Sequence, residues 1–189
     1  MSEYIKLCIR DFQLPDSIDI QRVTLGAFKQ YKDHYDNWGM FSTKLEELIS
    51  MAINLRLGEL IVATVDKKVV GSVVYVPTEK IEDSFPKAGA VIRLLAVDPH
   101  YRSAGIGKAL TEECIRRALH SKLPHVSLHT SPIMEVALKM YLRMGFKLEK
   151  EMPSLYGVPY NIYIKYLANN KFKTMAHDLP EHLECRLNS

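Results

Sequence analysis

The chain has 189 residues, of which 47% are hydrophobic and 25% charged, and its formal net charge is +3. This length and composition are typical of one globular domain with or without short appendages, and the mild charge argues against a dedicated nucleic-acid-binding protein. No segment has the apolar length of a signal peptide or a membrane span, so we expect no association with a membrane.

The three cysteines, Cys8, Cys114 and Cys185, are far apart in the sequence. They form no CxxC pair and no cluster with histidines, so we expect no metal site. Their odd number argues against a disulfide framework and fits a reducing compartment. The pattern therefore predicts a cytoplasmic protein.

The first part of the chain predicts one strand and two helices. Pro15 and Asp16 punctuate the start of the first helix, and Thr43 with Glu46 three residues later has the pattern of a helix capping box. We expect a strand over 5–12, a helix within 14–31, an irregular aromatic stretch over 32–41 and a second helix from Ser42 or Thr43 to about Leu57.

A strand pair and a buried strand follow. Glu59–Val65 and Lys68–Val76 are apolar runs joined by Asp66 and Lys67, which predicts a hairpin. After a loop, Ala90–Val97 is a nearly unbroken apolar run, as expected of a central strand that is covered on both faces.

The last part of the chain predicts two helices and three strands. A helix begins after Gly105, and Gly145 is a natural stop for the second one. We expect a helix to about Leu119, a strand over His125–Thr130, a helix from Pro132 to about Met144, and a hairpin made of 146–152 and 158–167. The order β, α, α, β, β, β, α, β, α, β, β predicts a mixed α/β domain with about seven strands.

The segment "DPHYRSAGIGKALTEE", residues 98–113, carries the clearest chemical signal. Gly105 and Gly107 follow the buried strand and open a helix, where unpaired N–H groups and the positive end of the helix dipole attract an anion. Arg102 and Lys108 add two cations that suit a phosphate. Read alone, the two glycines are equally consistent with a tight turn and a close contact between helix and strand.

Two nucleotide-binding patterns do not match this segment. The P-loop pattern fails because Ala109 follows Lys108 and no glycine lies five residues before Gly107. The dinucleotide pattern GxGxxG fails because Leu110 occupies the position of the third glycine. We therefore do not expect a nucleotide-binding protein of either class.

The segment "RSAGIGKA" after "LLAVDP" resembles the acetyl-CoA signature of the Gcn5-related N-acetyltransferase (GNAT) superfamily, and "ALKMYLRMGF", residues 137–146, is similar to that family's next motif. The resemblance covers residues 6–167 and is most specific over 92–146. It implies a GNAT domain over 1–167 with a central mixed, mostly antiparallel sheet of about seven strands and about four flanking helices. Residues 168–189 then form a tail, which is a short helix, an arm or disordered.

The resemblance implies an acetyl-CoA-dependent N-acetyltransferase in which a primary amine attacks the thioester directly. It places the pyrophosphate of CoA on the glycine loop and the pantetheine arm along the central strand, with one backbone N–H near Val97 facing the carbonyl oxygen. The expected cofactor-binding residues are Leu95, Ala96, Val97, Arg102, Ser103, Ala104, Gly105, Ile106, Gly107 and Lys108.

The resemblance also implies Tyr141 as the general acid that protonates the departing thiolate. A glutamate on the central strand often serves as the general base in this family, but here Arg93 is the only charged residue of that strand. The alternatives for the general base are His129, Glu79, Glu82, Asp83 and a relay of water molecules. An asparagine that often contacts the cofactor is replaced by Met134, and Thr130 or Ser131 are candidates to replace that contact.

The acceptor side is rich in aromatic residues. Trp38, Phe41, Tyr156 and Tyr160 are expected to form an apolar pocket or a cage for a cation, and the alternative for each is packing in the core. The expected partners are a small-molecule or peptide amine and a second copy of the chain in a homodimer. The alternative function is a non-catalytic acyl-CoA-binding or regulatory module on the same fold.

Overall fold

The computed structural model describes residues 7–77 and 84–167. The predicted tail over 168–189 lies outside these residues, as do Glu79, Glu82 and Asp83. Its strands are β1 (Leu7–Asp11), β2 (Glu59–Val65), β3 (Lys68–Val76), β4 (Ala90–Val97), β5 (His125–Thr130), β6 (Lys147–Glu151) and β7 (Asn161–Tyr166), and its α-helices are α1 (Ser17–Lys29), α2 (Trp38–Ile53), α3 (Ile106–His120) and α4 (Glu135–Arg143).

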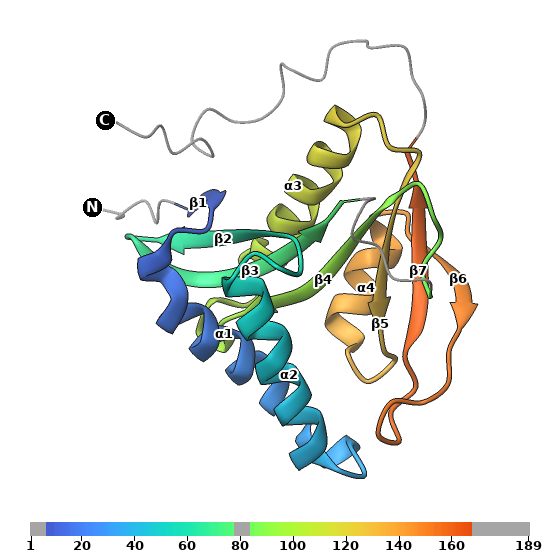
Figure 1. Cartoon of the computed structure of the whole chain (residues 1–189), viewed down its shortest axis with the longest axis horizontal. Coiled ribbons are helices and arrows are strands. Elements are labelled where there is room, and N and C mark those ends of the chain that lie inside the picture. Colours follow the sequence, from blue (N-terminus) through green and yellow to red (C-terminus); the bar gives the residue numbers. More distant parts are fainter. Residues whose placement is uncertain (1–6, 78–83, 168–189) are drawn as a thin grey trace.

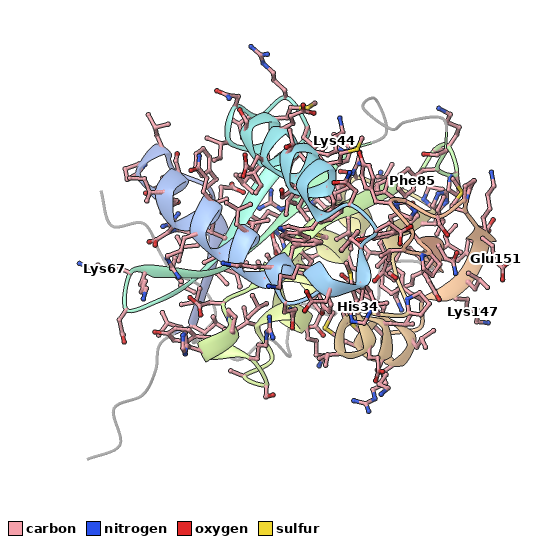
Figure 2. All side chains as sticks on the ribbon, turned by 90° about the horizontal axis from the view of Figure 1, so that it is seen from below. His34, Lys44, Lys67, Phe85, Lys147 and Glu151 are labelled. Carbon is pink, nitrogen blue, oxygen red and sulfur yellow. The ribbon has the colours of Figure 1, made fainter. Side chains whose placement is uncertain are left out.

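The strands form a seven-stranded sheet in the order β1-β2-β3-β4-β5-β7-β6. All neighbouring strands pair antiparallel except β4 and β5, which are parallel. This confirms the predicted mixed, mostly antiparallel sheet. Lys67, in the turn between β2 and β3, lies at the opposite end of the molecule from Lys147 and Glu151 of β6 (Figure 2).

The helices cover both faces of the sheet. Helices α1 and α2 lie side by side over one face, and α3 lies behind the same strands (Figure 1). The core on the α1 and α2 face includes Phe41, Leu45 and Val62, and the core on the α3 and α4 face includes Leu110 and Val126. The long apolar strands β2, β3 and β4 are buried from both sides for this reason.

The predicted bounds of β2, β3, β4 and β5 are confirmed, but the predicted start of α2 is wrong. The helix begins at Trp38 because the Asn37 side chain accepts a hydrogen bond from the Met40 N–H at 3.0 Å. The Thr43 hydroxyl donates to the Gly39 carbonyl inside the helix and does not cap it. The helix also ends at Ile53, before Leu57, since Leu55 has a φ of +55°.

Two later elements are shorter than predicted. Helix α4 starts at Glu135 and not at Pro132, and β7 starts at Asn161 and not at Val158. Val158 instead forms an isolated bridge with Leu155 across Tyr156 and Gly157, which both have positive φ. Val158 therefore belongs to this tight turn and not to β7, which was expected to begin there.

Strand β4 is irregular at its centre. Its register with β3 places Leu94 and Leu95 together opposite Val73, and Leu94 has a φ of +51°. This is a β-bulge, which bends the strand and shifts the alternation of its side chains. Leu94 packs on the core beside α1 and α2, whereas Leu95 and Val97 pack on the core beside α3 and α4.

Strands β4 and β5 separate just before the bulge. Their parallel pairing covers Ala90, Val91 and Ile92, and it ends where Ile92 faces Leu128. β5 continues along β7, while β4 continues along β3, so the two strands diverge (Figure 1). The divergence leaves one edge of β4 without a strand partner over its last residues in the described chain.

An ion pair holds the end of β4 against α1. The Arg22 guanidinium donates to Asp98 at 2.6 Å, and the Asp98 side chain is only 4% exposed. Burial by itself raises the pKa of Asp98, but the hydrogen bonds from Arg22 and from the His100 N–H outweigh burial and lower it. The carboxylate therefore fixes the start of the segment that follows β4.

We predict that Asp98→Asn lowers the free energy of unfolding by about 2 kcal/mol at neutral pH, less than for a fully buried pair because Arg22 is 43% exposed. Because the folded pKa is lowered, this stabilisation is present above the usual carboxyl pKa and is lost as the pH falls through the folded value. The difference from wild type should thus shrink below about pH 4. Urea denaturation at several pH values measures it.

Asp19→Asn is the matched control, because Asp19 also accepts from Arg22 but is 36% exposed. We expect it to change stability by less than about 0.5 kcal/mol. Equal losses in the two variants would contradict the role given to the buried carboxylate.

Candidate functional site

The segment between β4 and α3 presents unpaired backbone N–H groups. Ser103 has a φ of +63°, and Gly105, the N-cap of α3, has a φ of +76°. The Ala109 N–H makes the first helical bond, to the Gly105 carbonyl at 2.9 Å. The N–H groups of residues 106–108 precede that bond and have no helical acceptor, which is the arrangement that suits an anion at a helix start.

This helix start opens on a cavity of about 400 Å³. The cavity is bounded by the end of β4, the glycine segment, the last turn of α1 and one face of α4. Every predicted cofactor-binding residue except Ala104 lines it: Leu95, Ala96, Val97, Arg102, Ser103, Gly105, Ile106, Gly107 and Lys108. The structure thus gathers these residues around one space, and their role in binding a cofactor stays a prediction.

Gly107 leaves room where α3 faces α4 and β4. A Cβ atom built on it would lie 3.5 Å from the Met140 sulfur and 3.7 Å from a Val97 methyl group. A Cβ at this position is tolerated, but a large side chain would fill the cavity. Gly105 differs, because nothing lies within 4 Å of a Cβ built there and its positive φ alone favours glycine.

The two predicted phosphate-binding cations already have neighbours. Arg102 donates to the Gln30 side-chain oxygen at 2.8 Å, and Lys108 lies 3.4 Å from Glu112 one turn later in α3. Both contacts are exposed, and neither ties the cation into the core. Exposed contacts of this kind are weak enough for an entering anion to replace them.

The backbone of Val97 faces the cavity side of β4. The Asp98 N–H donates to the Val70 carbonyl at 2.8 Å, and Val97 pairs with Gly71. In an antiparallel ladder this makes the Val97 and Gly71 pair the one without hydrogen bonds, so the Val97 N–H points away from β3. It points to the side where β5 has already separated from β4.

Tyr141 lies in the core on the α3 and α4 face and does not line the cavity. Its ring packs edge-on against Phe146 at 5.6 Å, and the side chain is 5% exposed. Burial raises the pKa of Tyr141 above its usual range, which keeps the hydroxyl protonated. Ala137, one helical turn before Tyr141, and Met140, directly before it, do line the cavity. Tyr141 therefore lies next to residues of the cavity wall.

His129 lies apart from Tyr141, on β5 and outside the cavity lining. Its ring is 5.1 Å from that of Tyr160 and 5.9 Å from that of Phe85. The side chain is exposed. The structure therefore does not bring the two predicted catalytic residues together at one point.

The predicted acceptor-side residues do come together, in an aromatic cluster centred on Tyr35. The Tyr35 ring stacks on the Phe41 ring with 4.0 Å between their centroids, and its centroid lies 5.7 Å from that of the Trp38 ring. The Tyr35 hydroxyl oxygen lies 2.5 Å from the Tyr160 hydroxyl oxygen, within hydrogen-bond distance. Tyr156 completes the cluster edge-on to Phe41. Burial raises the pKa of Tyr35 to about 12 and also raises that of Tyr160.

The cluster is a packed core in this structure and not an open cage. Phe41 and Tyr160 are 6% and 7% exposed, and only Trp38 and Tyr156 are partly exposed. Of the two roles expected from the sequence, a pocket for the acceptor or packing in the core, the second is the one that Phe41 and Tyr160 have. Any acceptor contact from the cluster comes from Trp38 or Tyr156.

Several cavity residues were not expected from the sequence. Met134 lines the wall as an apolar group, whereas Thr130 and Ser131 are buried and do not line it. The other unexpected lining residues lie around the end of α1, before the glycine segment and on α4: Ala27, Phe28, Gln30, Tyr31, Tyr101, Val136, Ala137, Met140 and Arg143. The aromatic stretch over 31–41 was assigned to the acceptor side, and of its residues only Tyr31 lines this cavity.

The described residues contain no helix long and apolar enough to cross a membrane. They also contain no group of three or more His, Cys, Asp or Glu side chains that could hold a metal ion.

Residues 27–146 match the model of the acetyltransferase (GNAT) family. No curated protein is detectably similar to this chain in sequence.

Solved structures share the fold at low identity. A GNAT-family acetyltransferase from Staphylococcus aureus MU50 superposes with a TM-score of 0.66 at 18% identity, covering 86% of this chain and 99% of its own. yncA from Salmonella typhimurium, solved with its cofactor acetyl-CoA, has a TM-score of 0.66 at 14% identity, covering 90% and 99%. The PaiA N-acetyltransferase of Thermoplasma acidophilum, solved with coenzyme A, has a TM-score of 0.66 at 19% identity, covering 85% and 99%.

The conformation of Gly105 generates a stability prediction. Gly105→Ala should lower the free energy of unfolding by about 1 kcal/mol, because an alanine at a φ of +76° is strained although it has space. Gly26→Ala, in the middle of α1 where a Cβ also has space, should instead raise it by about 0.5–1 kcal/mol. Chemical denaturation of both variants measures the two signs, and a gain in stability for Gly105→Ala would contradict the conformation described for the loop.

Proposed function

Because this chain belongs to the acetyltransferase (GNAT) family, we propose that it is an acetyl-CoA-dependent N-acetyltransferase that acetylates a primary amine. The observation that carries the proposal is the position of the α3 start. Its unpaired N–H groups open on the same cavity as the end of β4, at the place where β4 and β5 separate. An anion site joined to a free strand edge suits a ligand with a phosphate part and a peptide-like arm.

The residues present fit CoA in chemical character. The N–H groups of residues 106–108, with Arg102 and Lys108, offer donors and positive charge to a pyrophosphate. The pantetheine arm carries amide groups, and these can pair with the edge of β4 that β5 leaves free, in the way that one strand binds another. Leu95, Ala137 and Met140 give the cavity an apolar wall between these polar parts.

Acetyl-CoA, when bound, supplies the acetyl group as a thioester that a neutral amine can attack. The protein then has to place the thioester, stabilise the negative charge that develops on its oxygen, and move protons. Val97 is our candidate for the second task, because its N–H is directed away from β3 and toward the cavity side of β4.

Tyr141 is our candidate for the proton donor. Its hydroxyl has no hydrogen-bond partner among the described residues, and burial keeps it protonated. Reaching the sulfur requires the hydroxyl to meet the cavity between Ala137 and Met140, which lie on the same helix. The thiolate of CoA leaves readily, so a donor here contributes less than general acids usually do.

The acceptor amine has to lose a proton before it attacks. Strand β4 carries no carboxylate, and His129 is our candidate base on the described part of the chain, next to Tyr160 and on the α1 and α2 face. Trp38 and Tyr156, at the exposed margin of the aromatic cluster, are the candidate contacts for the acceptor.

A non-catalytic acyl-CoA-binding or regulatory module is the second candidate function. The observation in its favour is that neither Tyr141 nor His129 lines the cavity and that β4 lacks a carboxylate. The two functions share the cofactor site and differ in whether an amine is acetylated.

We predict that Gly107→Trp abolishes CoA binding, because an indole at this position fills the cavity beside Met140 and Val97. Isothermal titration calorimetry measures binding in the wild type and the variant. Leu119→Trp is the control, since Leu119 is 46% exposed near the other end of α3 and should bind CoA like the wild type. If Gly107→Trp binds CoA as tightly as the wild type, the assignment of this cavity as the CoA site is wrong.

We predict that Tyr141→Phe lowers kcat by about tenfold and leaves the KM for acetyl-CoA nearly unchanged. Because burial raises the pKa of Tyr141, the rate should increase as the acceptor amine loses its proton and should not fall near pH 10, where an ordinary tyrosine ionises. Initial rates from pH 6 to about 10.5 in both proteins measure this. A fall near pH 10 that disappears in Tyr141→Phe would contradict the buried, protonated hydroxyl.

A further inference from the structure

Arg143 is a cation of the cofactor cavity that lies outside the glycine segment. It lies in the last turn of α4 and lines the cavity together with Val136, Ala137 and Met140 of the same helix face. It therefore belongs to the part of the cavity wall that α4 forms beside the start of α3. Three cations line this one cavity: Arg102, Lys108 and Arg143.

Arg143 differs from the other two cations in making no hydrogen bond or ion pair with the described residues. Arg102 donates to Gln30, and Lys108 lies next to Glu112. Within residues 7–77 and 84–167, the Arg143 guanidinium makes no hydrogen bond and no ion pair, and the residue is exposed. Its donors are available to a ligand without the loss of an existing contact.

The usual structural role of a basic residue in a last helical turn is already filled. Such residues stabilise the last carbonyl groups and the negative end of the helix dipole. Here the Lys165 ammonium of β7 donates to the Met144 carbonyl at 2.6 Å, and so it caps α4 from the neighbouring strand. Arg143 is not needed for this purpose.

The position of Arg143 suits a second phosphate a short distance from the first. Met140 is the α4 residue nearest to a Cβ built on Gly107, at 3.5 Å. Arg143 is three residues further along α4, about 4.5 Å along the helix axis, and its long side chain extends the reach. A group next to the phosphate at the α3 start thus lies within reach of the guanidinium.

We propose that Arg143 binds the 3′-phosphate of the CoA ribose and makes the site selective for CoA over dephospho-CoA, which lacks that phosphate. The inference rests on the proposed function, because it takes the cavity to be the CoA site. The helix start, Arg102 and Lys108 serve the pyrophosphate, and the Arg143 guanidinium on α4 is left for the remaining charge. Arginine holds a phosphate with two parallel hydrogen bonds.

The test compares two ligands in wild type and in the variants Arg143→Gln, Lys139→Gln and Lys108→Gln, by isothermal titration calorimetry at low salt, where exposed ion pairs are least screened. Wild type should bind CoA about five- to tenfold more tightly than dephospho-CoA. In Arg143→Gln this preference should fall to less than about twofold, through weaker binding of CoA and unchanged binding of dephospho-CoA. Lys139→Gln, which removes a charge from the same helix where Lys139 pairs with Glu135, should keep the wild-type preference.

The outcomes separate the two proposals. If wild type binds neither ligand, the CoA site itself is wrong. If wild type binds both ligands equally, or if Arg143→Gln weakens both to the same extent, the site stands and the role of Arg143 is overturned. A preference that survives in Arg143→Gln and is lost in Lys108→Gln also overturns it, because Lys108 then holds the 3′-phosphate.

Discussion

The separation of β4 from β5 is the constraint on which the site depends. A parallel pair that continued to Val97 would use both edges of β4 and would leave no backbone group for a ligand. The bulge at Leu94 bends the strand while its pairing with β3 continues to Val97, so one edge stays attached and the other is released. A non-glycine residue at a φ of +51° is an uncommon conformation, and here the strand pairing and core packing on either side hold it in place.

The rest of the structure stabilises this opening from its two ends. The Arg22 and Asp98 pair holds the end of β4 on α1, and Leu110 and Cys114 bury α3 against the opposite face of the sheet. The helix start therefore comes to lie at the mouth of the gap, with its N–H groups turned to the cavity. Positive charge from Arg102, Lys108 and Arg143 surrounds the same space, although the whole chain carries a net charge of only +3. Local arrangement, rather than composition, makes the site attractive to an anion.

Much of the fold could be predicted because its signals are local. The apolar runs of β2 to β5 are bounded by turn residues, and the glycine segment correctly predicted the start of α3. The start of α2 was missed because its cap, Asn37, lies inside an aromatic stretch that has no helical pattern. The bulge at Leu94 was not visible either, since leucine gives no sign of a positive φ.

The candidate site was predictable only where one segment carries it. Arg22 and Asp98 are 76 residues apart and Tyr35 and Tyr160 are 125 apart, so only the folded chain shows that they meet. Tyr141 and His129 were placed by motif and by residue type, which do not reveal that they lie in different surroundings. In the same way, the sequence suggests only that Arg143 stabilises the end of its helix. The folded chain shows that Lys165 already caps that helix.

Amine-dependent release of free thiol from acetyl-CoA tests the central claim most directly. The wild-type protein is incubated with acetyl-CoA and, one at a time, with polyamines, amino acids, aminoglycosides and peptides that offer an N-terminal or lysine amine. If the protein is an N-acetyltransferase, at least one class raises thiol release well above the rate without amine, and mass spectrometry finds the acetyl group on that amine. Tight CoA binding without amine-dependent thiol release for any acceptor would contradict this function and would favour the non-catalytic module.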